Sequence, residues 1–513
     1  MFEYSVQPTW RLKMEIITAV TAWALSSACK SIPAGHWLAS VCPRGGNLTE
    51  LSGRLSSDAH VYYPGSDVFI EATNRWSSFH APGVNVVVVP GVDDDIIQTV
   101  KYANENDMPY LAVTGGHGAI ITTGRMQNGI EIWMDQLSGV EVAEDGTSAK
   151  IKGGTLSKTV TETLWAAGKQ TVTGGCECTS LLGPGLGGGH GFLQGRHGLI
   201  SDQFLSMDIV LANGSLVTID DNSDLWWAMQ GAGHNFGIVT SVTSKIYDIE
   251  HRDWAYESFV FTSDKVEGLY GNINAYLLNN GSPPVDIINY GFFLNNPAID
   301  SKPVTYFYIL QEGATVVDLT YTKPFHDLGP AEAGAGSGSY LDLPAWTGLN
   351  NEAAPCQHTG LANTRFPLDI QVYDVPAMRR VYDEFAAATQ ATPALNGSFF
   401  LIEGYSLQGV RAVASESAAF PFRGDPLLVA PVISWAPAGP ELARQAAALG
   451  TRLRRILHEA SGRAEMHTYV NYAFGDETPE NWYGYETWRQ ERLRQLKDKY
   501  DPERKFSFYA PIA

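Results

Sequence analysis

Three glycine-rich segments in the first half of the chain constrain its fold more than any other feature. They span residues 114–118, 173–191 and 231–237. Glycine lets the backbone take positive φ angles and approach a ligand closely, and successive backbone amides can surround a pyrophosphate. A single segment of this kind is also typical of a tight turn, but three of them within one α/β region predict a dinucleotide-binding site.

The chain around the first glycine-rich segment predicts a β-α-β unit. The β-branched run Val86–Val89 is typical of a buried strand. Acidic residues 93–95 favour the first turn of a helix, because a helix N-terminus stabilises negative charge. Residues 110–113 then form a second strand, and the first glycine-rich segment leaves the end of it. Further along, Asn213-Gly214 predicts a hairpin between two short strands.

Changes in residue composition divide the chain into consecutive parts. An apolar stretch at 16–25 is followed by small residues, which is typical of a secretory signal peptide and is shorter than the roughly 20 residues of a membrane-spanning helix. After residue 250, the alternation of short predicted strands and helices gives way to longer aromatic-rich stretches. The Gly- and Ala-rich stretch 329–338 is expected to be a mobile loop. We therefore expect a signal peptide over 1–28, a first domain over 60–250, a second domain over 251–455 and a C-terminal segment over 456–513.

The charge balance excludes several kinds of partner. The 513 residues include 35 Lys and Arg against 55 Asp and Glu, which gives a net charge of −20. Such an acidic surface repels nucleic-acid phosphates and anionic lipid headgroups. We expect a monomer that binds no nucleic acid and has no stable membrane insertion.

Two further features favour the secretory pathway. Asn-x-Ser/Thr sequences, which accept N-linked glycans, occur at Asn47, Asn213, Asn280 and Asn396. Five cysteines leave at least one thiol unpaired, and Cys29 and Cys42 are candidates for a disulfide in an oxidising compartment. We expect a secreted glycoprotein.

The glycine-rich segments, read residue by residue, resemble a known family. The sequences are Thr-Gly-Gly-His-Gly at 114–118, Gly-Gly-Cys-Glu-Cys-Thr-Ser-Leu-Leu-Gly-Pro-Gly-Leu-Gly-Gly-Gly-His-Gly at 174–191 and Gly-Ala-Gly-His-Asn-Phe-Gly-Ile-Val at 231–239. They resemble the FAD-linked oxidases of the vanillyl-alcohol-oxidase superfamily, and Tyr-Val-Asn-Tyr-Ala at 469–473 narrows the resemblance to the berberine-bridge-enzyme-like branch. The resemblance implies an α+β fold with a PCMH-type FAD-binding domain, an antiparallel-sheet substrate domain, and a C-terminal segment that returns to the FAD domain.

The resemblance also implies the residues that hold the cofactor. His117 falls where the family attaches the flavin covalently, and a neutral imidazole nitrogen is a suitable nucleophile for that bond. Cys176 falls at the family's second attachment point, but the Cys-Glu-Cys around it departs from the common Cys-Pro-Thr, so single attachment through His117 is favoured over double attachment. The other expected FAD contacts are Thr114, Gly115, Gly116, Gly118, Thr179, Ser180, Gly183, Gly185, Gly188, Asp202, Ile238 and Val239.

Two candidates for a catalytic base follow from the same resemblance. Tyr472 corresponds to a tyrosine that acts as a base or orients the substrate, and Asn471 and Tyr469 would support it. A tyrosine acts as a base only if its pKa, normally about 10, is lowered. Glu403 lies on a predicted strand, about where some members of the family place a catalytic carboxylate. The sequence leaves the choice between the two open.

The resemblance implies an oxidase that passes a hydride from a small organic molecule to covalent FAD, with O2 as the acceptor and H2O2 as the product. A hydrophobic secondary metabolite is the expected substrate. A carbohydrate oxidase of the same fold and a redox-neutral isomerase or cyclase with FAD as a scaffold are the alternatives. His190 and His234 lie in glycine turns without a third ligand at a useful spacing, so no metal site is predicted.

Overall fold

The computed structural model describes residues 48–281 and 283–512. The contacts divide the chain into residues 1–53 and residues 54–513, and helix α2 (Leu48–Arg54) begins the described part. The predicted signal peptide, the Cys29–Cys42 pair and Asn47 lie outside the described residues. None of the described helices is long and apolar enough to cross a membrane.

A four-stranded sheet contains the predicted β-α-β unit. Its strands are β1 (His60–Tyr62), β2 (Val84–Val89), β3 (Tyr110–Val113) and β4 (Gly129–Trp133), in the order β1-β2-β4-β3. Helix α4 (Asp93–Glu105) connects β2 to β3, and both strands run parallel to β4, which lies between them. The acidic residues fall in the first turn of α4 as expected, and β3 ends directly before the first glycine-rich segment.

A five-stranded antiparallel sheet follows. Its strands are β5 (Val140–Val142), β6 (Ser148–Lys152), β8 (Phe204–Leu211), β9 (Leu216–Ile219) and β10 (Gly237–Lys245), in the order β5-β6-β10-β8-β9. Strands β8 and β9 form the hairpin that Asn213-Gly214 predicts, and Gly214 has a φ of 77°. Helix α5 (Ser157–Ala166) and the short helix α6 (Leu182–Leu186) precede β8.

The second half of the chain builds an eight-stranded antiparallel sheet. Its order is β15-β12-β14-β13-β18-β19-β16, and β17 also pairs with β19. The strands are β12 (Trp254–Phe261), β13 (Ile287–Leu294), β14 (Val304–Glu312), β15 (Glu332–Gly338), β16 (Ala362–Arg365), β17 (Leu368–Ile370), β18 (Phe399–Gly404) and β19 (Leu427–Trp435).

Strand β15 corrects one prediction. The Gly- and Ala-rich stretch expected to be a mobile loop is an edge strand, paired with β12 over seven residue pairs from Trp254↔Gly338 to Val260↔Glu332. Small residues give no alternating pattern, so the sequence carried no strand signal here. The backbone hydrogen bonds that form the strand do not depend on the side chains.

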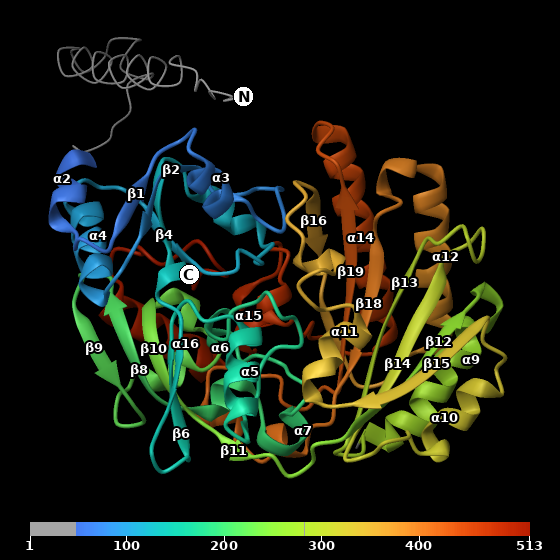
Figure 1. Cartoon of the computed structure of the whole chain (residues 1–513). Coiled ribbons are helices and arrows are strands. Elements are labelled where there is room, and N and C mark those ends of the chain that lie inside the picture. Colours follow the sequence, from blue (N-terminus) through green and yellow to red (C-terminus); the bar gives the residue numbers. More distant parts are fainter. Residues whose placement is uncertain (1–47, 282, 513) are drawn as a thin grey trace, which may run out of the picture. The chain divides into compact units, whose positions relative to one another are not determined.

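One face of the large sheet is buried under helices, and the other face lines a cavity. Helices α9 (Val266–Asn272), α10 (Leu319–His326), α12 (Val375–Ala391) and α14 (Pro440–Ala460) cover one face (Figure 1). Strand β18 shows the alternation, because Phe400 and Ile402 join the core beneath these helices. Phe399, Leu401 and Glu403 point to the other face and line a cavity.

The C-terminal segment returns to the first part of the molecule, as expected. Helices α15 (Pro479–Tyr483) and α16 (Thr487–Tyr500) share a hydrophobic core with the five-stranded sheet. The buried ammonium of Lys497 contacts the carboxylate of Asp501 and donates to the carbonyls of Asn235 and Phe506. These bonds join the end of α16 to the third glycine-rich segment.

Candidate active site

A cavity of about 360 Å³ lies between the glycine-rich segments and the open face of the eight-stranded sheet. The glycine-rich segments and β10 supply one part of its lining. The sheet and the short 3₁₀ helix Val470–Tyr472 supply much of the rest. Segments from both halves of the chain and from its C-terminal end therefore meet at one place.

The first glycine-rich segment presents free backbone amides at this cavity. None of the amides of residues 115–118 donates a hydrogen bond to an acceptor among residues 48–281 and 283–512. Gly116 has a φ of 62°, which bends the backbone as anion-binding loops require. A Cβ at Gly115 would lie 2.5 Å from the carbonyl oxygen of Cys178, so this approach of the first two segments needs glycine. The loop has the donors and the shape to hold a pyrophosphate.

His117 lies in this loop and points into the cavity. Its ring stacks on Trp76, with the ring centroids 5.3 Å apart and the planes inclined by 16°. Burial, followed by the positive charge of Arg365 and then by His358, lowers the pKa of His117 well below its usual value. The imidazole is therefore neutral at physiological pH and keeps a lone pair for bond formation.

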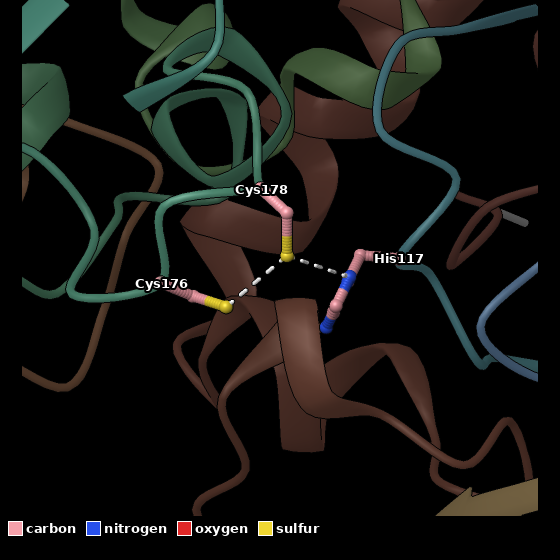
Figure 2. Close-up of side chains that lie close together, drawn as sticks. All are labelled: His117, Cys176 and Cys178. Atoms are coloured by element: carbon pink, nitrogen blue, oxygen red, sulfur yellow. Dashed lines mark hydrogen bonds between the residues drawn. The ribbon is translucent and has the colours of Figure 1, made fainter. Parts of the chain in front are cut away.

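Three cysteines meet beside His117. Cys178 and Cys356 form a disulfide across 178 residues of sequence, and Cys176 is a free thiol. The Sγ of Cys176 lies 3.4 Å from both disulfide sulfurs. The Sγ of Cys178 lies 3.9 Å from Nδ1 of His117, and Figure 2 shows these two side chains beside Cys176. The sulfur of Cys178 is already bonded to Cys356, so it offers no thiolate to a metal ion. Sequence reasoning missed this disulfide, because nothing in the local pattern relates residues so far apart.

Burial determines the chemistry of the remaining thiol. It raises the pKa of Cys176 to about 11, although a backbone hydrogen bond from Cys178 and the charge of Arg365 act in the opposite direction. The thiolate is the nucleophilic form of cysteine. Cys176 is therefore a protonated and weakly nucleophilic group at neutral pH.

Glu403, on the sheet side of the cavity, forms a hydrogen-bonded cluster with two tyrosines. Tyr472 donates to Oε1 of Glu403 over 2.9 Å, and Tyr405 donates to Oε2 over 2.8 Å. Burial raises the pKa of Glu403 above its usual value, although the two hydrogen bonds and the charge of Arg365 oppose the rise. Burial and then the neighbouring Glu403 raise the pKa of Tyr472 well above its usual value. Tyr472 is thus a hydrogen-bond donor, and the carboxylate is the group that can accept a proton.

Tyr469 and Asn471 fasten the C-terminal segment to the second glycine-rich segment. The Nδ2 of Asn471 donates to the hydroxyl of Tyr469 over 2.7 Å and to the carbonyl of Pro184 over 2.9 Å. A Cβ at Gly187 would lie 2.2 Å from Oδ1 of Asn471, so this contact requires the glycine. The two residues hold Tyr472 in position.

Most of the residues singled out from the sequence line this one cavity. They are Thr114, Gly115, Gly116, His117, Gly118, Cys176, Thr179, Ser180, Gly183, Ile238, Val239, Glu403, Tyr469, Asn471 and Tyr472. The lining also includes Trp76, Tyr290, Arg365, Phe399 and Tyr405, which carried no motif in the sequence.

Three expected cofactor contacts lie outside the cavity lining. A Cβ at Gly185 would meet the ring of Phe204, and one at Gly188 would meet the ring of Phe420, so both glycines serve close packing behind the wall. Asp202 forms a buried ion pair with Arg423, at 2.8 Å, and accepts from the amide of Leu199. A carboxylate neutralised in this way has a structural role.

Comparison with known proteins decides the family. Residues 84–220 match the FAD binding domain family, and residues 468–513 match the family described as berberine and berberine like. The chain is 54% identical, over 98% of its length and 100% of the relative's, to the FAD-linked oxidoreductase chyH of Penicillium rubens. The chain is a berberine-bridge-like FAD-linked oxidoreductase. This oxidoreductase also shares its fold with two solved structures of low sequence identity.

The first of these structures is Physcomitrella patens BBE-like 1. It has a TM-score of 0.76 at 18% identity, over 91% of this chain and 100% of that one. The second is the xylooligosaccharide oxidase from Myceliophthora thermophila in complex with xylobiose, with a TM-score of 0.76 at 21% identity, over 91% and 99%. The predicted PCMH-type fold with an antiparallel substrate sheet is confirmed.

The residues present in the oxidoreductase fit FAD. The acceptor-free amides of residues 115–118 match the pyrophosphate, and the glycine-specific contact of the first two segments keeps that loop open to it. The neutral His117 and the carboxylate of Glu403 lie at the same cavity, so it has groups both for holding a flavin and for accepting a proton from a substrate.

Proposed function

We propose that this oxidoreductase oxidises a small hydrophobic secondary metabolite at a hydroxyl-bearing carbon, with FAD held covalently through His117. The chemistry that FAD supplies when bound is hydride acceptance followed by electron transfer to O2, with H2O2 as the product. The observation that carries the proposal is the Glu403 carboxylate, which accepts hydrogen bonds from Tyr472 and Tyr405 at the cavity wall.

In this proposal Glu403 is the base and Tyr472 is its donor. A carboxylate with a raised pKa takes a proton from a substrate hydroxyl more readily than an exposed one. Burial raises the pKa of Glu403, whereas Tyr472 has a pKa so high that it retains its proton. The phenol of Tyr472 therefore fixes the orientation of the carboxylate and stays available as a donor to the substrate oxygen.

The protonation states favour a single covalent bond to the flavin. His117 is neutral and has a free lone pair, whereas the thiol of Cys176 is protonated near neutral pH. The disulfide Cys178–Cys356 additionally places two sulfurs against the Cys176 thiol. These features support attachment through His117 alone.

The cavity wall and the disulfide support the substrate class and the compartment. Tyr290, Phe399 and Leu401 form an apolar surface on the open face of the sheet, which suits a hydrophobic molecule better than a sugar. Disulfides persist in oxidising compartments. The Cys178–Cys356 bond therefore supports passage through the secretory pathway.

Acid precipitation of the purified protein tests the cofactor part of the proposal. We expect a yellow pellet and a flavin on the peptide that contains His117. His117→Ala should release the flavin to the supernatant, and Cys176→Ser, the matched control, should not. A colourless pellet with FAD in the supernatant of the wild-type protein would contradict covalent attachment.

Oxygen consumption tests the reaction. Aromatic and allylic alcohols should give O2 uptake with equal H2O2 release, and oligosaccharides should not. Uptake with oligosaccharides would favour the carbohydrate oxidase, and a product formed without O2 uptake would favour the redox-neutral alternative.

A further inference from the structure

Arg365 is the second arginine of the cavity wall and differs from the first in its partners. The other cavity arginine, Arg75, pairs with the buried carboxylate of Glu131 and donates to the carbonyl of Ala72. The guanidinium of Arg365 makes no hydrogen bond and no ion pair with any residue in 48–281 and 283–512. Its charge is therefore not neutralised by a direct partner in the described part of the protein.

Two aromatic rings hold this guanidinium in place. Its Cζ lies 4.1 Å from the ring centroid of Trp76 and 4.6 Å from that of Tyr472. Cation–π contacts of this kind orient a guanidinium, and they leave its N–H groups free because they use the aromatic faces. Arg365 has five N–H donors in a planar fork, and it is half-buried at the cavity wall.

The sheet register places Arg365 on the substrate wall. Arg365 in β16 lies opposite Val432 in β19, and Val432 lies opposite Phe399 in β18. Directly opposed residues in antiparallel strands point to the same face, and all three side chains line the cavity. Tyr472 links this end of the wall to the base, because its ring lies beside Arg365 and its hydroxyl bonds to Glu403.

A cation without a direct partner beside an apolar wall calls for an anionic ligand. Glu403 is the only carboxylate of the cavity wall in the described ranges, and both of its oxygens already accept from tyrosines. The pyrophosphate of FAD has its own donors in the amides of residues 115–118. The net charge of −20 does not prevent anion binding here, because charges on the outer surface are screened over about 8 Å at physiological salt.

We propose that Arg365 binds a carboxylate of the substrate, so that the substrate is an aromatic or conjugated acid with its reacting hydroxyl directed at Glu403. The fork of the guanidinium matches the two oxygens of a carboxylate. Tyr472 connects the two ends of such a substrate site, because its ring lies beside Arg365 and its hydroxyl bonds to Glu403. This inference rests on the proposed function, since it names the substrate class of the same site.

Isothermal titration calorimetry of the purified holoenzyme tests the proposal with two probes of matched shape. The probes are para-toluate and its neutral amide, para-toluamide, which lack the hydroxyl that the proposed reaction oxidises and therefore bind without turnover. A charge-assisted hydrogen bond contributes about 1.5–3 kcal/mol, so we expect the carboxylate to bind at least about tenfold more tightly than the amide. Arg365→Met should remove the preference, and Arg365→Lys should retain only part of it.

Arg380→Met is the matched control. Arg380 is exposed on α12 and lies outside the cavity lining, so its replacement changes the net charge by the same amount and should leave the preference intact. Equal binding of the two probes to the wild-type protein, or a preference that survives in Arg365→Met, would overturn the proposal. So would loss of FAD from Arg365→Met alone, because the anion would then be a phosphate of the cofactor.

Failure of this proposal is distinguishable from failure of the oxidase proposal. Calorimetry detects binding without turnover, so the carboxylate preference is measured whether or not the protein consumes O2. An enzyme that oxidises neutral alcohols with no carboxylate preference would keep its proposed function and lose the role of Arg365.

Discussion

The phenol of Tyr472 donates a hydrogen bond to Oε1 of Glu403 over 2.9 Å, although 69 residues of sequence separate the two side chains. The bond joins the C-terminal segment to the centre of the eight-stranded sheet, where Glu403 lies between Tyr290 of β13 and Leu428 of β19. It decides which of two candidate bases is free to accept a proton.

Tyr472→Phe should move the acid limb of the pH–kcat profile to higher pH. The hydrogen bond from Tyr472 lowers the pKa of Glu403 against the effect of burial, so its removal raises that pKa further. A base with a higher pKa is deprotonated only at higher pH, and we expect kcat at neutral pH to fall about tenfold to a hundredfold. Steady-state kinetics from acidic to alkaline pH would measure both effects. Tyr405→Phe is a parallel test, because it removes the other hydrogen bond to Glu403 and should shift the acid limb in the same direction. An unmoved limb in both variants would exclude Glu403 as the titrating base.

Glu403→Gln should lower kcat about a hundredfold to ten-thousandfold, with unchanged flavin content. It should also change the dependence of stability on pH. A carboxyl with a raised pKa in the folded state contributes stability that is fully present below its unfolded pKa and is lost as the pH rises through the folded one. Because burial raises the pKa of Glu403, the Tm of Glu403→Gln minus that of the wild-type protein should increase as the pH rises above the ordinary glutamate pKa of about 4.3. Calorimetric melting curves would check this, and a difference that falls with pH would contradict the direction of the shift.

The double variant Cys178→Ser, Cys356→Ser should lose about 2–4 kcal/mol of unfolding free energy. The disulfide closes a loop between residues 178 positions apart, and its loss increases the freedom of the unfolded chain. A single replacement is a poorer test, because Cys176 lies 3.4 Å from either sulfur and can form a replacement bond. Peptide mapping without reductant should first find the Cys178–Cys356 link. Cys176→Ser is the control and should change stability by less than about 1 kcal/mol.

Asp202→Ala should destabilise the fold by about 3–5 kcal/mol, because it leaves the buried guanidinium of Arg423 without its partner. Both side chains of this ion pair are 4% exposed. The folded fraction should keep the wild-type ratio of flavin absorbance to protein absorbance. Chemical denaturation and visible spectra of the same samples would check the two statements. Loss of flavin without loss of stability would instead support a direct contact between Asp202 and the cofactor.

Local sequence pattern was sufficient for the parts of the protein that depend on neighbouring residues. The β-branched run and acidic first turn identified β2 and α4, and Asn213-Gly214 identified the β8–β9 hairpin. The glycine-rich motifs predicted the loop that we propose holds FAD, together with His117, because positive φ angles and close backbone approach leave little choice of residue. The sequence did not predict strand β15, because backbone pairing at a sheet edge needs no side-chain pattern.

The sequence by itself determined the family, the glycine-rich loop proposed for the cofactor and the two candidates for the base. Only the tertiary structure decided that Tyr472 donates to Glu403, that Cys178 pairs with Cys356 and leaves Cys176 free, that Asp202 pairs with Arg423, and that Arg365 lies at the cavity with no hydrogen bond or ion pair to a residue in the described part of the chain. The physical reason is the same in each case. Protonation, pairing and burial depend on which groups meet across sheets and segments far apart in the chain, and local residue patterns carry no information about those distances.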